Sequence, residues 1–166
     1  MSTQDVSALV NKALELVEHG QLLEAKQLYQ QVTAADADNA EAWMMLGSIN
    51  AEMGRQGEAQ EQLRQAIALD PEMPEAHFYM AHVLKNQGNL EGALASLESA
   101  VANDDEYAEA WSMLGGICGM LERPERAETC CRRAVELMLD SPETQMNLSN
   151  ALFRQGKFEE ATDHYQ

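Results

Sequence analysis

The sequence predicts an all-α fold, built from antiparallel helix pairs that repeat every 34 residues. The octet AEAWMMLG begins at Ala40 and returns as AEAWSMLG at Ala108, which is 68 residues or two periods later. A weaker copy, PEAHFYMA, begins at the midpoint. An alanine also recurs at one place in every period: Ala25, Ala59, Ala93, Ala127 and Ala161. Agreement at five registered positions indicates one structural unit copied five times.

We therefore expect a single array over residues 1–166, with repeats at 6–39, 40–73, 74–107, 108–141 and a truncated 142–166. In the second repeat, Trp43, Leu46 and Gly47 follow the i, i+3, i+4 spacing of one helix face. Gly54 ends this first helix, and a second helix runs to the residues before Pro71. Each repeat is thus predicted to be a helix–turn–helix hairpin, whose first and second helices are here called helix A and helix B.

The turns of the later repeats follow the same plan with one substitution. Gly88 and Gly156 stand at the turns of the third and fifth repeats. In the fourth repeat Arg123-Pro124 replaces the glycine turn, and proline suits the first turn of a helix because its missing N–H would be unpaired there. Gly47 and Gly115 lie where helices A and B must cross closely, which compensates for their low helix propensity.

This pattern resembles the tetratricopeptide repeat (TPR) family, whose 34-residue helix pair carries Trp, Leu and Gly on helix A and small residues on helix B. The matching residues of the second repeat are Trp43, Leu46, Gly47, Ala59, Leu63, Ala66 and Pro71, and those of the fourth are Trp111, Leu114, Gly115, Ala127 and Ala134. The resemblance implies a superhelical solenoid in which helix A of every repeat lines a concave groove. It also implies a scaffold that binds a peptide or a partner protein in that groove.

A second face of helix A, offset from its packing positions, supplies the candidate groove residues. This face is rich in methionine, which adapts to irregular partners, and it carries little charge at its centre. The predicted protein-binding residues are Asn11, Leu14, Met44, Met45, Ser48, Phe78, Tyr79, His82, Met113, Asn147 and Asn150. The alternative is that some of them, Met45 and Met113 above all, pack against helix A of the next repeat.

The charge balance limits the classes of partner that the chain is expected to bind. With 11 basic and 28 acidic residues the net charge is −17, which argues against nucleic acid and anionic membranes and favours a basic partner. A glutamate opens helix A in four repeats, at Glu41, Glu75, Glu109 and Glu143. We prefer to explain these glutamates by their favourable interaction with the helix dipole. The alternative is that they form an acidic rim that binds a basic ligand.

Catalysis has little support in the sequence, so we expect no enzyme, no cofactor and no metal. The four histidines are scattered over different repeats, and no nucleotide-binding or hydrolase motif is present. The cysteines, Cys118, Cys130 and Cys131, are odd in number and clustered, which favours buried thiols in a reducing, cytoplasmic location. The cluster Arg123, Arg126, Arg132 and Arg133 is expected to be a solvated face opposite acidic neighbours rather than an anion site.

The sequence stops inside helix B of the fifth repeat, without a polar capping helix. We therefore expect a homodimer through this uncapped repeat, with self-association residues Leu152, Phe153, Phe158 and Tyr165. The contact would be either two-fold or head-to-tail, and a head-to-tail contact would propagate into filaments unless a ring closes. We therefore favour the two-fold dimer, with fraying of the last helix as the alternative. An alternative is that the chain is the N-terminal recognition arm of a larger enzyme, such as a glycosyltransferase, sulfotransferase or methyltransferase, whose catalytic domain follows residue 166.

Overall fold

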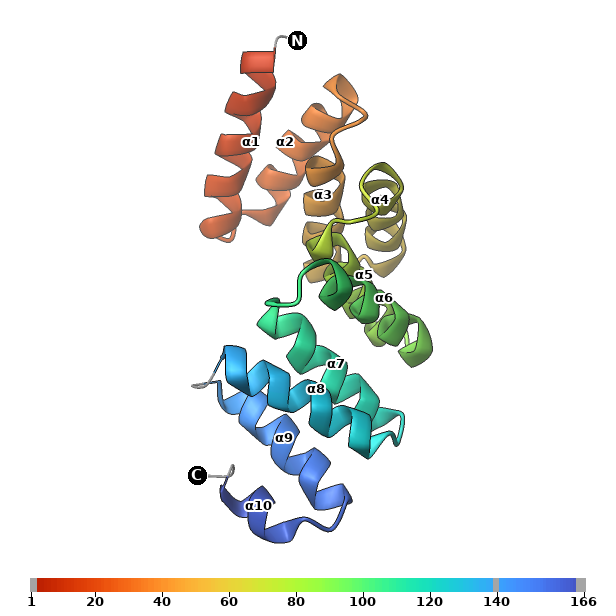
Figure 1. Cartoon of the computed structure of the whole chain (residues 1–166). Coiled ribbons are helices and arrows are strands. Elements are labelled where there is room, and N and C mark those ends of the chain that lie inside the picture. The colour runs from red at the N-terminus through yellow and green to blue at the C-terminus, as the bar shows by residue number, and fades with distance from the viewer. Residues whose placement is uncertain (1–2, 139–140, 164–166) are drawn as a thin grey trace. The chain divides into compact units, whose positions relative to one another are not determined.

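The computed structural model describes residues 3–138 and 141–163, a part of the chain that holds ten α-helices and no strand (Figure 1). Contacts divide the chain into two compact units, Met1–Gln87 and Gly88–Gln166. The first unit contains α1 (Thr3–Glu18), α2 (Leu22–Ala35), α3 (Ala40–Glu52), α4 (Gln56–Leu69) and α5 (Pro74–Asn86). The second unit contains α6 (Leu90–Asn103), α7 (Ala108–Met120), α8 (Pro124–Leu137), α9 (Pro142–Arg154) and α10 (Phe158–Asp163).

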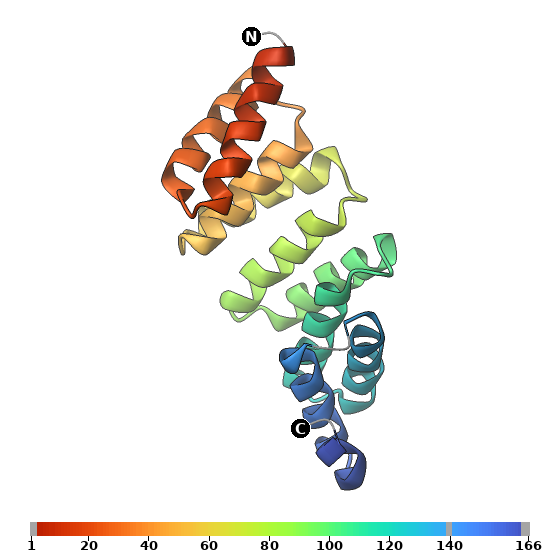
Figure 2. The same ribbon diagram turned by 90° about the vertical axis from the view of Figure 1, so that its left-hand side faces the viewer.

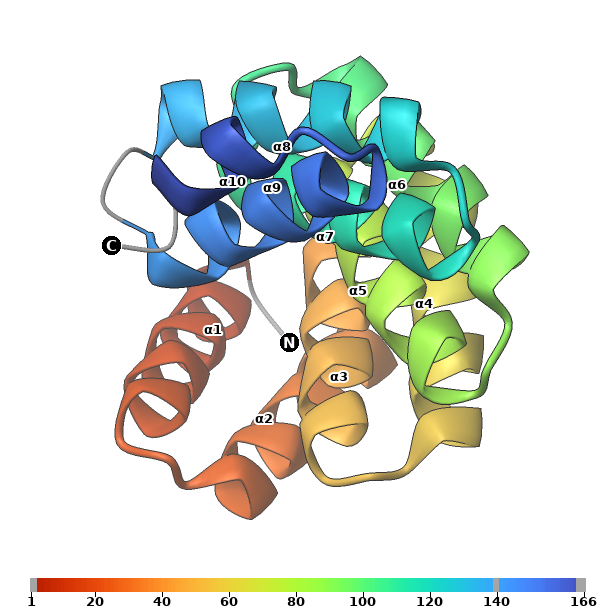
Figure 3. The ribbon, with the colours of Figure 1, turned by 90° about the horizontal axis from the view of Figure 1, so that it is seen from below.

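Within each unit, consecutive helices pack against one another as antiparallel pairs. In the first unit α1 packs on α2 and α3 on α4, and Figure 2 shows the α1–α2 pair side by side. In the second unit α7 packs on α8 and α9 on α10, and α9 also lies against both α7 and α8 (Figure 3). These repeated pairs confirm the prediction of an all-α fold built from antiparallel helix pairs.

The turn inside each hairpin requires one residue with positive φ. Gly54 takes this place after α3 with φ 76°, and its N–H donates to the Ala51 carbonyl at 3.0 Å. The next N–H, that of Arg55, reaches back to the Asn50 carbonyl at 2.8 Å, which satisfies carbonyls that the helix end leaves unpaired. Glu122 holds the same place after α7 with φ 57°, in a region that side chains disfavour.

Close contact between helices A and B explains the glycine in the middle of α3. A Cβ added to Gly47 would stand 2.5 Å from Leu63 Cγ and 3.2 Å from the Ala59 carbonyl oxygen. Gly115 occupies the same place in α7, where an added Cβ would collide with Cys131 Sγ. The recurring alanines Ala59 and Ala127 are buried opposite these glycines, so the small residues of both helices permit the crossing.

One polar network lies inside the first unit. Asn50 is fully buried and accepts a hydrogen bond from Lys26 Nζ at 2.7 Å. Its amide nitrogen donates to Gln62 Oε1 at 2.6 Å, and Lys26 is also ion-paired with Glu58 at 2.9 Å. These two hydrogen bonds satisfy both the oxygen and the nitrogen of the buried Asn50 amide, which lies among mostly apolar core residues.

Candidate functional site

Most of the predicted groove residues of the first unit lie on accessible surface of helix A. Asn11 and Leu14 of α1 are exposed, and Met45 and Ser48 of α3 are half-buried. Met44 is different, because only 8% of its surface is exposed. Since α3 packs against α2, α4 and α5, a side chain on most sides of this helix is covered by a neighbour. The prediction that Met44 is available to a partner is therefore corrected.

The accessible face of α5 combines two aromatic rings and an imidazole, all half-buried. Phe78 and Tyr79 meet edge to face, with ring centroids 5.7 Å apart. Burial raises the pKa of Tyr79, and the negative charges of nearby glutamates raise it further. Burial, followed by the charge of Lys85, lowers the pKa of His82, so the imidazole is neutral at pH 7. This face is amphipathic.

In the second unit, α7 and α9 border a cavity of about 320 Å³. Gly115, Gly116, Gly119 and Met120 line it from α7, Ala127 lines it from α8, and Asn147, Asn150, Ala151 and Arg154 line it from α9. We call this the α7–α9 cavity. It brings together two of the predicted groove residues, Asn147 and Asn150, whereas Met113 is half-buried on α7 and does not line it.

Two side chains of α9 that line the cavity donate hydrogen bonds to α7. The Asn147 amide donates to Ser112 Oγ at 3.4 Å, and one guanidinium nitrogen of Arg154 donates to the Gly119 carbonyl at 3.0 Å. A Cβ added to Gly119 would meet nothing within 4 Å, and one added to Gly116 would meet only Asn147 Nδ2 at 3.8 Å. The two glycines therefore leave the backbone of α7 open along the cavity.

Sequence reasoning missed Arg154 as a site residue. It follows Asn147 by seven residues and Asn150 by four, a spacing that places all three on one helix face. That spacing was available from the sequence, but the arginine had no counterpart on the predicted groove face of the other repeats.

The predicted self-association residues have different surroundings. Phe153 and Phe158 are 57% and 56% exposed and meet edge to face, with ring centroids 5.1 Å apart. Leu152 is 0% exposed, because it packs in a core cluster with Cys131, Leu148 and Ala161. The prediction that Leu152 is available for self-association is thus corrected. Tyr165 lies outside the described residues.

The arginine cluster is neutralised by glutamates. Arg123 pairs with Glu91 at 2.7 Å, Arg126 pairs with Glu98, and Arg132 contacts two glutamates at 2.8 Å. Among the described residues, no three His, Cys, Asp or Glu side chains are grouped so as to hold a metal ion. Nor does the described chain include a helix with the length and apolar character needed to span a bilayer.

Comparison with known proteins identifies repeat families over nearly the whole chain. Residues 9–138 match the model described as the cilia and flagella-associated protein 70 middle TPR-like domain. Residues 143–166 match a tetratricopeptide repeat model. No significant match was found among curated protein sequences.

Solved structures share the fold. MamA from Desulfovibrio magneticus is 21% identical, with a TM-score of 0.83 over 96% of this chain and 90% of that chain. A thermophilic TPR protein of Thermus thermophilus is 20% identical, with a TM-score of 0.76 over 96% and 88%. A mutant O-GlcNAc transferase of Thermobaculum terrenum is 29% identical and has a TM-score of 0.76, but the match covers 82% of this chain and 27% of the transferase. The chain therefore belongs to the tetratricopeptide repeat family, in the group described as the cilia and flagella-associated protein 70 middle TPR-like domain.

Proposed function

We propose that this protein is an interaction scaffold that holds an extended segment of a partner protein in the α7–α9 cavity. The TPR fold in general supports a protein-interaction scaffold. The observation that favours this particular place is the composition of the cavity, which combines the half-buried Gly116 and Gly119 on one helix with amide and guanidinium donors on the other.

The chemistry of the cavity suits a peptide backbone. An extended segment presents carbonyl oxygens, and these accept hydrogen bonds from Asn147, Asn150 and Arg154. Arg154 uses one N–H on the Gly119 carbonyl and has further donors in its planar fork. Because Gly116 and Gly119 lack side chains, the segment's own backbone approaches α7 closely. Binding through the backbone tolerates different side chains in the partner.

In the first unit, the accessible face of α5 provides a surface for apolar side chains of a partner. Phe78 and Tyr79 offer large amphipathic rings with few rotatable bonds, and Met45 on α3 offers an adaptable thioether. We include His82 in this surface because it is neutral and half-buried. Asn11, Leu14 and Ser48 remain proposed contacts of the same helix A faces.

A basic partner is part of the proposal. The net charge of −17 attracts positively charged segments over a distance of about 8–10 Å at physiological salt. The glutamates that open four of the A helices, including Glu75 and Glu109, are exposed and add to this field. Association with a basic peptide should accordingly slow as salt concentration rises, while the dissociation rate changes little.

Selection from a random peptide library against the full chain, followed by affinity measurements on variants, tests the proposed site. Replacing Asn147 or Asn150 by alanine should weaken a selected peptide about 2- to 12-fold, the effect of losing one hydrogen bond. A Cβ at Gly119 meets nothing within 4 Å, so Gly119→Leu should place its side chain in the cavity and abolish binding. Asn103→Ala, on the exposed end of α6, is the matched control and should bind as the wild type does. Equal affinities for all four variants would refute the site.

Self-association through Phe153 and Phe158 is a second proposed mode. Two aromatic rings that are both more than half exposed form an unusual apolar patch, and a second copy of the chain offers a matching one. The alternative role as an arm of a larger enzyme is not what these observations favour.

A further inference from the structure

The glutamates that open four of the A helices differ in the residue that follows one helical turn later. Residues four positions apart are neighbours on one face of a helix, so each glutamate has a partner position on its own helix. The four pairs are Glu41 with Met45, Glu75 with Tyr79, Glu109 with Met113, and Glu143 with Asn147. Of these four helices, only α5 therefore places a carboxylate beside an aromatic ring.

The ring on α5 is held in a fixed orientation and is partly accessible. Tyr79 is half-buried, and it meets Phe78 with an angle of 69° between the ring planes and 5.7 Å between the centroids. Glu75 is exposed in the first turn of the same helix. Glu52, also exposed, lies at the end of α3, which packs against α5. Burial raises the pKa of Tyr79, and the charges of Glu75 and then Glu52 raise it further, so both carboxylates act on this ring.

Neither Glu75 nor Glu52 is ion-paired with any residue that the structure describes. Lys85, the lysine of α5, stands ten residues after Glu75, which is about three helical turns away. The α5 face thus offers two exposed negative charges and an aromatic ring to a cation from outside this unit.

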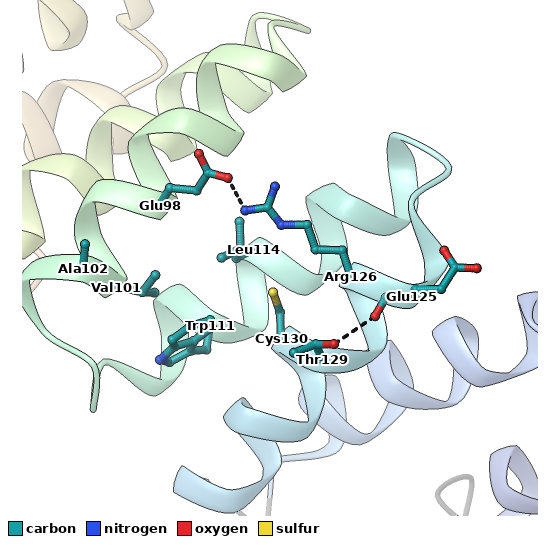
Figure 4. A pocket seen from close by; sticks show the side chains of 9 residues that line it. All are labelled: Glu98, Val101, Ala102, Trp111, Leu114, Glu125, Arg126, Thr129 and Cys130. Carbon is teal, nitrogen blue, oxygen red and sulfur yellow. Dashed lines mark hydrogen bonds and ion pairs between the residues drawn. The ribbon is translucent and has the colours of Figure 1, made fainter.

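The other unit contains an aromatic ring and a glutamate that are already supplied with a cation. Trp111 and Glu98 line a cavity of about 740 Å³ bordered by α6, α7 and α8. Arg126 lines the same cavity and is ion-paired with Glu98 (Figure 4). In that cavity the chain itself neutralises the carboxylate, which makes it the internal contrast to the α5 face.

We propose that the α5 face binds an arginine side chain of the partner segment, with the guanidinium group over the Tyr79 ring and beside the Glu75 carboxylate. This inference rests on the proposed function, in which the α5 face contacts a basic partner. Complementary charge is the reason to choose arginine over an apolar residue, because the chain has a net charge of −17 and these two glutamates are not ion-paired. A guanidinium group is planar and weakly hydrated, stacks on aromatic faces and pairs with carboxylates. Its methylene stem packs on the apolar part of the rings.

An NMR titration of the isotope-labelled full chain tests the proposal with two tripeptide probes. The first probe is acetyl-Gly-Arg-Gly amide. The second carries citrulline in place of arginine, which exchanges the guanidinium group for an uncharged urea group of nearly the same shape. The arginine probe should shift the ring signals of Tyr79 and the backbone amide signal of Glu75, and the citrulline probe should leave both in place.

Variants assign the binding to the ring and to its carboxylate. Tyr79→Leu and Glu75→Gln should each weaken the arginine probe about 2- to 5-fold, the effect of one exposed cation–π contact or ion pair. Tyr79→Phe keeps the ring and should bind as the wild type does. Glu109→Gln is the matched control, because it removes the same charge at the same place of α7, where Met113 stands instead of an aromatic ring.

Equal shifts with the two probes would overturn the proposal, and so would equal affinities of Glu75→Gln and Glu109→Gln, which would show attraction by net charge alone. Glu75→Gln and Tyr79→Phe decide the question even if Tyr79→Leu fails to fold. The result is separate from the test of the α7–α9 cavity, which depends on Asn147 and Asn150. An arginine probe that does not bind α5 would therefore leave segment binding in that cavity standing.

Discussion

Three glycines of α7 differ in what surrounds them, and substituting each by alanine tests the close crossing of helices A and B. A Cβ on Gly115 would collide with Cys131 Sγ and would stand 3.3 Å from two backbone atoms of α8, the Ala127 oxygen and the Cys131 nitrogen. Gly116 has space for a Cβ, and Gly119 has nothing within 4 Å. The three substitutions are chemically identical, so only the surroundings distinguish them.

The expected magnitudes follow from two opposing effects. Alanine is favoured over glycine in a helix interior by about 1 kcal/mol, which should appear as added stability for Gly116→Ala and Gly119→Ala. At Gly115 the same gain is offset by overpacking, which costs about 1–3 kcal/mol when a neighbour must move. Backbone atoms of α8 cannot rotate away, so we expect Gly115→Ala to lose up to about 2 kcal/mol.

Urea unfolding gives the stability of each variant, and native-state hydrogen exchange reports α7 directly. In the wild-type protein, α7 amides should exchange faster than those of α3, because α7 carries two glycines without a packing role. Exchange in α7 should slow in Gly116→Ala and Gly119→Ala and quicken in Gly115→Ala. Gly47→Ala in α3 should behave like Gly115→Ala. The reasoning fails if Gly115→Ala is as stable as Gly119→Ala.

Three further changes have defined outcomes. Glu122→Gly should stabilise the protein by about 1 kcal/mol in thermal or urea unfolding, because φ 57° disfavours a side chain; a loss of stability would contradict this. Burial opposes the ionisation of Glu128, but hydrogen bonds from Lys157, Arg132 and Gln155 lower its pKa from 4.5 to about 2. Its folded pKa is depressed, so its contribution to stability is present above pH 4.5 and is lost as the pH falls towards 2. The free energy of unfolding of Glu128→Gln should then depend less on pH in this window, and an unchanged profile would refute the assignment. Phe153→Asp should abolish any concentration-dependent association in light scattering while the helical circular dichroism stays unchanged, and association as strong as that of the wild type would exclude the proposed patch.

Much of the fold could be predicted from the sequence, because small residues recur in the repeats where helices A and B cross. Gly47 and Gly115 predicted where helices A and B approach, and the structure places both against the facing helix. The positive φ in the turn after α7 was harder to predict from the sequence. Glu122 takes the positive φ that glycine takes in the other hairpins, so no residue type indicated it.

The binding face was less predictable, because burial depends on neighbouring helices rather than on spacing within one helix. Met44 stands off the packing stripe of its helix, but adjacent helices cover it. Leu152 follows the buried Leu148 by four residues, so its burial could have been predicted from that spacing. Arg154 belongs to the site because α7 and α9 border one cavity, and the spacing within α9 alone does not indicate that cavity. The single five-repeat array and the cytoplasmic location stay predictions.

Chemical-shift mapping of the full chain with a library-selected peptide shows where a partner segment binds. The largest shifts should fall on the α7–α9 cavity, at Gly116, Gly119 and the side-chain amides of Asn147 and Asn150, with residues of α10 unaffected. Shifts confined to the helix B surfaces of α8 and α10 would contradict it.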